Sequence, residues 1–304
     1  MSSINIAALE SFYVGGTPRQ VQHRIFGAET QVAGAMYVQR LAPQKQCFPF
    51  PIVFVHGGMH SGVTWETTPD GREGWQTLFV RAGFETLVID QAWRGRSAPD
   101  LTGLNPFVGD AEPVGPVFTC GLEMGERFAR GGGRFPLAQS QCYGAQLWPD
   151  FGVPGAIAAG TPGRSDPRAL APLLELIDML GKVVLITHSQ GGDLGWRAAL
   201  NRPCQVVAIV SVEPAQTCPG LDDPAFPEIP VRLVWGDNLP EQAPALSLKD
   251  VEQARELSRR HPNISLDYLP EQGILGNGHM LMMEDNNHDI AARVSAWLLS
   301  IRFE

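Results

Sequence analysis

The sequence predicts an α/β protein in which helices cover both faces of a mostly parallel central sheet. Short apolar runs rich in β-branched residues recur at 52–56, 85–90 and 183–187, and such runs are typical of strands buried on both faces. Segments with helical periodicity lie between these runs, as at 75–82 and 167–180. Alternation of strand and helix favours a parallel sheet.

The other expected elements extend this pattern. Two early strands, at 10–14 and 31–41, lie either side of the turn signal Gly15–Pro18 and suggest an antiparallel start to the sheet. Later strands are expected at 204–213, 229–236 and 264–269. Further helices are expected at 192–200, 248–261 and 285–301.

Length and composition indicate one domain that carries an insertion. A chain of 304 residues with 44% hydrophobic content can bury a large core. Between 98 and 166 the periodicity breaks down, and the segment is rich in Gly, Pro and aromatic residues. A long irregular stretch inside a compact domain is usually a functional lid, and its aromatic content argues against disorder. We therefore expect a core at 1–97 and 167–304 and a cap over the site at 98–166.

Charge and targeting features indicate which classes of partner and which cellular location to expect. The chain has 23 Lys and Arg against 32 Asp and Glu, a net charge of −9, which disfavours nucleic acid and anionic membranes. No apolar run reaches membrane-spanning length, and Met1–Glu10 lacks the features of a secretory signal. The five cysteines form no CxxC pair, which favours free thiols, although a Cys120–Cys142 bridge is an alternative. These features predict a cytoplasmic protein without a membrane span.

The segment Lys182–Gly192 carries the strongest chemical signal. Its apolar strand runs into Thr187-His-Ser-Gln-Gly191 and then into a helix. A strand, a sharp turn centred on Ser and a helix form a nucleophile elbow, which holds the hydroxyl above the sheet edge in a strained conformation. Small residues at Thr187 and Gly191 let the strand and helix approach closely. Ser189 is therefore the candidate nucleophile, with a passive Ser in a Gly-rich turn as the alternative.

A Ser nucleophile needs a base, and the base needs an orienting acid. In this topology the order along the chain is Ser, acid, His, each after a later strand. His279 lies in Gly276-Asn-Gly-His-Met280, between the last strand and the final helix, and is the candidate base. His288 follows closely but falls inside the final helix, where a surface position is expected.

Two carboxylates compete for the role of the acid. Glu213 ends the strand that follows the elbow, in Ser211-Val-Glu-Pro-Ala215. Asp237 follows the next strand, directly after Gly236, which leaves little chain to turn toward the imidazole. We favour Glu213 as the acid, and Asp237 is the alternative.

Two backbone amides are candidates for an oxyanion hole. The amide of Gln190, which follows the nucleophile, is one donor, and Gly58, in the Gly-rich loop after the strand at 52–56, supplies the other. His56 is expected to fix that loop through hydrogen bonds. For His60 the default is a partly exposed loop position, and a place in the pocket lining is the alternative. His188 is expected to pack with its ring facing away from the hydroxyl.

At these residues the chain resembles the α/β-hydrolase superfamily. The resemblance covers nearly the whole chain and rests on four segments: His56–Gly58, Asp90–Ser97, Thr187–Gly192 and Gly276–Met280. It implies the α/β-hydrolase fold and hydrolysis of carboxylic esters through an acyl-enzyme.

More narrowly, the chain resembles a group of bacterial esterases in which the triad acid is a Glu after the sixth strand. The Ser189–Glu213 spacing, the phrase Val212-Glu-Pro and the pair Asn286-Asn287 fit that group. Paired cysteines can occupy the oxyanion loop of that group where this chain has Gly58-Met59, so no redox feature carries over.

The predicted function is therefore a serine esterase acting on a small-molecule ester, without a metal or organic cofactor. A lactonase would use the same triad on a cyclic ester, and a binding protein on the same scaffold would normally have lost a triad member. A dehalogenase or epoxide hydrolase would need Asp in place of Ser189. Met280–Met283 fit either a pocket wall or core packing. The sequence leaves the oligomeric state open, with a homodimer as one arrangement.

Overall fold

The computed structural model describes residues 3–23, 25, 27–97, 133–148, 165–215, 223–237 and 248–303. Within this part of the chain, one sheet of eight strands has the order β1-β4-β6-β5-β7-β8-β9-β10. Its strands are β1 (Ile6–Val14), β4 (Met36–Pro43), β5 (Ile52–Val55), β6 (Thr86–Asp90), β7 (Val183–His188), β8 (Val206–Val212), β9 (Val231–Trp235) and β10 (Ile264–Tyr268).

The sheet is antiparallel at its first edge and parallel elsewhere. β4 pairs antiparallel with both β1 and β6. All pairs from β6 through β5, β7, β8 and β9 to β10 are parallel. The predicted α/β class with a mostly parallel sheet is confirmed, together with its antiparallel start.

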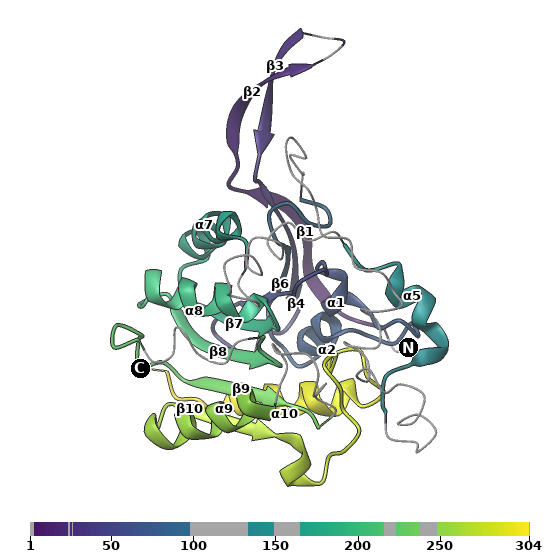
Figure 1. Cartoon of the computed structure of the whole chain (residues 1–304), viewed down its shortest axis with the longest axis vertical. Helices are drawn as coiled ribbons and strands as arrows, with labels where there is room; N and C mark the ends of the chain where they lie inside the picture. Colours follow the sequence, from purple (N-terminus) through teal and green to yellow (C-terminus); the bar gives the residue numbers. More distant parts are fainter. Residues whose placement is uncertain are drawn as a thin grey trace.

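Helices cover both faces of this sheet (Figure 1). The helices are α1 (Val63–Glu66), α2 (Trp75–Arg81), α5 (Ser140–Gly144), α7 (Leu170–Leu180), α8 (Gly191–Asn201), α9 (Leu248–Arg260) and α10 (Asn287–Ser300), with short 3₁₀ turns at Leu137–Gln139, Pro167–Ala169 and Leu269–Gln272. Buried side chains of α7, α8 and α9 join one core cluster, and those of α1, α2 and α10 join the other.

Successive residues of the central strands contribute their side chains alternately to the two core clusters. In β5, Val53 and Val55 belong to the first cluster, while Ile52 and Phe54 belong to the second. Successive side chains of a strand point to opposite faces, so a strand covered on both sides must be apolar at every position. This requirement explains why the parallel strands appear in the sequence as unbroken apolar runs.

A projecting hairpin between β1 and β4 was not predicted (Figure 1). The strands β2 (Thr17–His23) and β3 (Gly27–Ala33) pair with each other antiparallel and form a separate sheet. The expectation of one strand over 31–41 is therefore wrong, because Gly34, with φ of +80°, separates β3 from β4. The hairpin is mostly exposed, so it lacks the buried apolar face that identifies a strand in sequence.

Part of the expected cap lies within the described residues. Segments 98–132 and 149–164 lie outside them, so the domain division remains a prediction. Between them, Phe135 and Tyr143 are buried. The amide of Arg134 donates to the Gly276 carbonyl (3.0 Å), and the amide of Trp148 donates to the Met59 carbonyl (2.8 Å). This stretch of the insertion therefore contacts both the loop after β5 and the loop that carries His279.

The elbow between β7 and α8 packs with no spare room. A Cβ added at Gly191 would lie 2.6 Å from the His56 carbonyl oxygen and 2.9 Å from that of Val55. One turn later, a Cβ added at Gly195 would lie 2.9 Å from Cγ2 of Thr187. Residues without side chains thus let α8 approach the end of β5 at Gly191 and β7 at Gly195, as the motif predicts.

Replacing Gly191 by Ala should therefore destabilise the fold. The methyl group would press on backbone atoms that cannot rotate away, and overpacking of this kind costs about 3 kcal/mol, more than the roughly 1 kcal/mol that Ala gains over Gly in a helix. Gly192→Ala is the matched control, because its nearest contacts are side-chain atoms at 3.3–3.4 Å. Urea unfolding should give a much lower midpoint for Gly191→Ala alone, and equal midpoints for the two variants would contradict the packing argument.

Candidate active site

Ser189 lies in the turn between β7 and α8, at the carboxyl edge of the sheet. Its φ is +50°, in the left-handed region that a non-Gly residue rarely adopts. Two hydrogen bonds close the turn. The amide of Ser189 donates to the Val212 carbonyl (3.0 Å), and the amide of Gly192 donates to the Ser189 carbonyl (2.9 Å). The Ser189 residue is 7% exposed. The positive φ is the strained backbone geometry that the elbow motif implies, and the residue is buried under its surroundings.

The loop that carries His279 is fixed by hydrogen bonds on both sides. The amide of Gly276 donates to both carboxylate oxygens of Asp237 (2.9 and 3.0 Å), and the amide of Asp237 donates to the Asn277 carbonyl (3.1 Å). Nε2 of His188 donates to the His279 carbonyl (2.9 Å). Because His188 directly precedes Ser189, this last bond ties the histidine loop to the elbow.

Glu213 is the carboxylate beside the imidazole. It follows β8 with φ of +47° and is fully buried. Its Oε2 lies 3.5 Å from Nδ1 of His279, at the long end of the hydrogen-bond range, and its Oε1 accepts from the Gly236 amide (2.5 Å). Asp237, the alternative, binds the Gly276 amide instead. The structure therefore brings Glu213 and His279 together and gives Asp237 a backbone partner.

Burial governs the ionisation of this pair. It lowers the pKa of His279 to about 3, so the imidazole is neutral at neutral pH and can accept a proton. Burial also raises the pKa of Glu213 well above its usual value, opposed by the hydrogen bond from Gly236. A neutral imidazole is the form that a general base requires.

The loop after β5 lies against the elbow. A Cβ added at Gly57 would lie 3.0 Å from Cβ of Ser189 and 2.8 Å from Nδ1 of His188, so only glycine fits there. Gly58 follows Gly57 directly in this loop, and Gln190, which follows Ser189, is the N-cap of α8. The first amides of a helix lack partners within the helix and attract negative charge.

Three further histidines are buried around this site. His56 is hydrogen-bonded to the loop as expected, through Nδ1 to the Gly57 carbonyl (2.8 Å). The partly exposed position expected for His60 is wrong: it is 1% exposed, because its ring lies between the Gly58 carbonyl (2.6 Å) and the Tyr143 hydroxyl (2.9 Å). His188 is buried too, and in addition to packing it makes the bond to His279 described above.

Sequence reasoning missed a second buried carboxylate, that of Glu284. One oxygen accepts from the Gly278 amide and the other from Nδ2 of Asn277 (both 2.5 Å), and Asn277 also exchanges hydrogen bonds with the side chain of Asn286. Burial raises the pKa of Glu284 to about 8. The nearest signal in sequence is its position five residues after His279, which is too common a pattern to single out.

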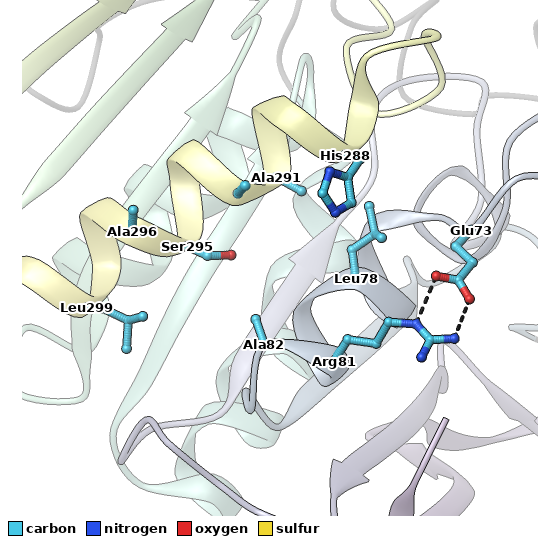
Figure 2. Close-up of a pocket in the computed structure, with 10 residues that line it drawn as sticks. Glu73, Leu78, Arg81, Ala82, His288, Ala291, Ser295, Ala296 and Leu299 are labelled. Atoms are coloured by element: carbon cyan, nitrogen blue, oxygen red, sulfur yellow. Dashed lines mark hydrogen bonds and ion pairs between the residues drawn. The ribbon is translucent and has the colours of Figure 1, made fainter. Parts of the chain in front are cut away.

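Two other candidates from the sequence occupy a helix surface and the core. His288 is on α10 with a side chain 74% exposed, as expected. It lines a surface groove between α2 and α10 together with the Glu73–Arg81 ion pair (Figure 2), and no proposed site residue lines that groove. Met280–Met283 are fully buried in the second core cluster, which favours core packing.

Neither a metal-binding cluster nor a membrane-spanning helix is present in the described part of the chain. No group of three or more His, Cys, Asp or Glu side chains there is arranged to hold a metal ion. None of the helices described has the length and apolar composition needed to cross a membrane. Cys47, Cys142 and Cys204 are exposed free thiols, and Cys120, the other half of the alternative bridge to Cys142, lies outside the described residues.

The chain is similar to known proteins both in sequence and in structure. No protein-family model matches the chain. A bacterial esterase of known structure is 30% identical, with a TM-score of 0.84, and the match covers 98% of this chain and 97% of the esterase. A fungal protein (strain ATCC 74256) described as a probable secreted lipase is 28% identical over 326 residues, covering 86% of this chain and 85% of the lipase.

A more distant structure supports the fold alone. A CIB-like hydrolase from Thermoplasma acidophilum has a TM-score of 0.51 at 16% identity, and the match covers 98% of this chain and all of that protein. At this identity only the arrangement of helices and strands is shared.

The expected cytoplasmic location is contradicted by the lipase relative, which is described as a probable secreted protein. That expectation depended on the lack of a basic start and an apolar core in Met1–Glu10 and on cysteines without a CxxC pair, and neither feature decides whether a protein is exported.

The esterase match spans both chains almost completely, and its identity and TM-score together exceed what a shared fold alone would give. The strand order, the elbow and the relatives agree, and this chain belongs to the α/β-hydrolase superfamily.

Proposed function

We propose that this carboxylic ester hydrolase is a serine esterase that works through an acyl-enzyme, with Ser189 as nucleophile, His279 as base and Glu213 as acid. One observation carries the proposal: the carboxylate of Glu213 lies 3.5 Å from the ring of His279, whose own carbonyl is bonded to the residue before Ser189. Catalytic hydrogen bonds are often long without substrate and tighten when it binds. The esterase and lipase relatives support the reaction class.

In the proposed reaction, Nε2 of His279 takes the proton of Ser189 as the hydroxyl attacks the ester carbonyl. The tetrahedral intermediate collapses, and the protonated imidazole gives its proton to the leaving alcohol. Water then attacks the acyl-enzyme by the same route and releases the acid. Glu213 holds Nδ1–H of His279 and stabilises the imidazolium that forms in each half of the cycle.

The amides of Gly58 and Gln190 are proposed to bind the oxyanion. Support comes from the contact of the Gly57 backbone with Ser189 and from the position of Gln190 at the N-terminus of α8. A helix N-terminus stabilises the charge that develops on the carbonyl oxygen.

Residues 98–166 are proposed to cover this site. The described stretch 133–148 supports this proposal, because its backbone bonds to Gly276 and Met59 and its Tyr143 side chain bonds to His60. Acyl-chain preference would then depend on how this insertion closes over Ser189.

The nucleophile can be tested by covalent labelling. A fluorophosphonate reagent should add one phosphonyl group to the wild-type chain, and Ser189→Ala should not be labelled, because the reagent needs the activated hydroxyl. Intact mass spectrometry measures both. Labelling of the Ala variant would show that Ser189 is not the nucleophile. If the wild type is not labelled and also does not hydrolyse a panel of chromogenic esters and lactones, a non-catalytic binding protein is favoured.

The acid can be tested with two amide variants. Glu213→Gln should lower kcat by about 10²–10⁴-fold, because the wrong tautomer of His279 is then stabilised. Asp237→Asn is the matched control, since it changes a carboxylate that binds the same loop without touching the imidazole, and it should lower kcat by less than about tenfold. Equal losses in the two variants would mean that the carboxylates only support the loop.

The pH profile should reflect the burial of His279. Its lowered pKa, about 3, means that the imidazole stays neutral as pH falls through the usual histidine range and becomes protonated only in strong acid. The acid limb that this ring contributes to kcat/KM should therefore lie well below pH 6.5. Because burial raises the pKa of Glu213, protonation of that carboxylate contributes a limb of its own, so the wild type is compared with Glu213→Gln. Initial rates between pH 4 and 9, with far-UV circular dichroism to verify folding, measure this, and a limb centred near 6.5 that Glu213→Gln retains would show that the ring is solvated in the working enzyme.

A further inference from the structure

Arg94 is a buried cation that no step of the proposed mechanism uses. It lies in the loop after β6 and is 2% exposed. Its Nη1 donates to the Gly57 carbonyl (2.9 Å), and its Nη2 donates to Oε1 of Gln190 (2.8 Å). One guanidinium thus joins the two segments that carry the proposed oxyanion donors.

The bond to Gly57 acts on the proposed donor directly, because the Gly57 carbonyl and the Gly58 amide belong to the same peptide unit. The unit is planar, and none of the described peptide bonds is cis, so the two groups point in opposite directions. Arg94 fixes the carbonyl on its own side, which turns the amide of Gly58 away from the guanidinium. Withdrawal of electron density by a charged donor also makes that amide a stronger donor.

A second donor reinforces this orientation. The amide of Gln91 donates to Nε2 of His56 (3.0 Å), so the ring proton is on Nδ1, which donates to the Gly57 carbonyl (2.8 Å). Burial, with Arg94 nearby, lowers the pKa of His56 to about 3 and keeps this neutral tautomer. The Gly57 carbonyl therefore accepts two hydrogen bonds, and only that of Arg94 brings a positive charge.

The second arm of Arg94 acts on the elbow. Gln190 supplies the other proposed oxyanion amide and is the N-cap of α8. Its side chain is held by Nη2, while its carbonyl accepts from the hydroxyl of Ser165 (2.8 Å). The rigid fork of a guanidinium holds two acceptors in fixed geometry, which the single ammonium of Lys does not.

We infer that Arg94 is a positioning residue for catalysis: it clamps the loop after β5 to the elbow and raises the positive potential at the oxyanion hole. This inference rests on the proposed function. Preorganised donors act on the charge of the transition state and hardly on the neutral ester. Loss of Arg94 should therefore lower kcat and leave KM nearly unchanged.

The test compares Arg94→Met and Arg94→Lys with the wild type on one chromogenic ester. Since removal of an oxyanion donor lowers kcat by about 10²–10³-fold, removal of the group that orients one should lower it by about 10–100-fold, with a smaller loss for Lys. The affinity for an alkyl boronic acid, which forms a tetrahedral adduct with the serine, should fall by a similar factor. The affinity for an ether analogue, which has no carbonyl, should stay within about threefold of the wild type.

Arg96→Met is the matched control in the same loop. Arg96 donates to Asp90 (2.7 Å) and Glu66 (2.6 Å) rather than to Gly57 or Gln190. It should lower the melting temperature without changing kcat by more than about threefold. If Arg94→Met does not fold, Arg94→Lys and Gln190→Met, which keeps the backbone amide but removes the acceptor, test the same clamp.

The outcomes distinguish failure of the proposed role of Arg94 from failure of the proposed esterase function. If the Arg94 variants lose no more kcat and boronate affinity than Arg96→Met does, the clamp is wrong. The proposed esterase function is not affected by that result. A parallel loss of affinity for the ether analogue also overturns it, because the residue would then shape the pocket rather than the oxyanion hole. If a fluorophosphonate does not label the wild-type protein, the proposed function itself is wrong.

Discussion

The close approach of the first turn of α8 to the end of β5 is the contact on which the rest of the site depends. Gly191 lies so near the carbonyls of Val55 and His56 that even a methyl group has no room. At the same point Gly57 lies against Ser189 and His188 without a side chain of its own. The loop after β5 and the elbow are thus closely packed. Larger residues at Gly57 or Gly191 would push the loop away from the elbow and so separate the two proposed oxyanion donors, the amides of Gly58 and Gln190.

Around this contact, carboxylates from three parts of the chain hold the histidine loop. Glu213 reaches the ring of His279, Asp237 binds the amide of Gly276, and Glu284 binds the amide of Gly278. Burial raises the pKa of both glutamates, and the backbone amides that donate to them work in the opposite direction. A loop held by carboxyl groups at several points keeps its imidazole in place without substrate, which reduces the reorganisation needed during reaction.

The parallel core and the elbow were predictable because both depend on local patterns. Strands buried on two faces must be apolar throughout, and the turn at Ser189 requires small residues at fixed spacing. The hairpin β2–β3 was missed because it is exposed and has no apolar face. Arg94 and Glu284 were missed for a different reason: their partners are backbone groups of distant segments, and a sequence does not show which carbonyl or amide will face a charged side chain. His60 was misjudged because its burial depends on Tyr143, which comes from the insertion.

Backbone strain is concentrated at the edge where these segments meet. Among the described residues, the non-Gly positions with positive φ are Met59, Trp93, Ser189 and Glu213, and they follow β5, β6, β7 and β8 respectively. These strands are neighbours in the sheet, in the order β6-β5-β7-β8. Each such residue costs about 1–3 kcal/mol and persists only where its surroundings determine it. Four turns that share this conformation on adjacent strands are therefore held by their mutual contacts. The hydrogen bonds of Arg94 to two of these turns belong to that support, which links the stability of the edge to the geometry of the proposed oxyanion hole.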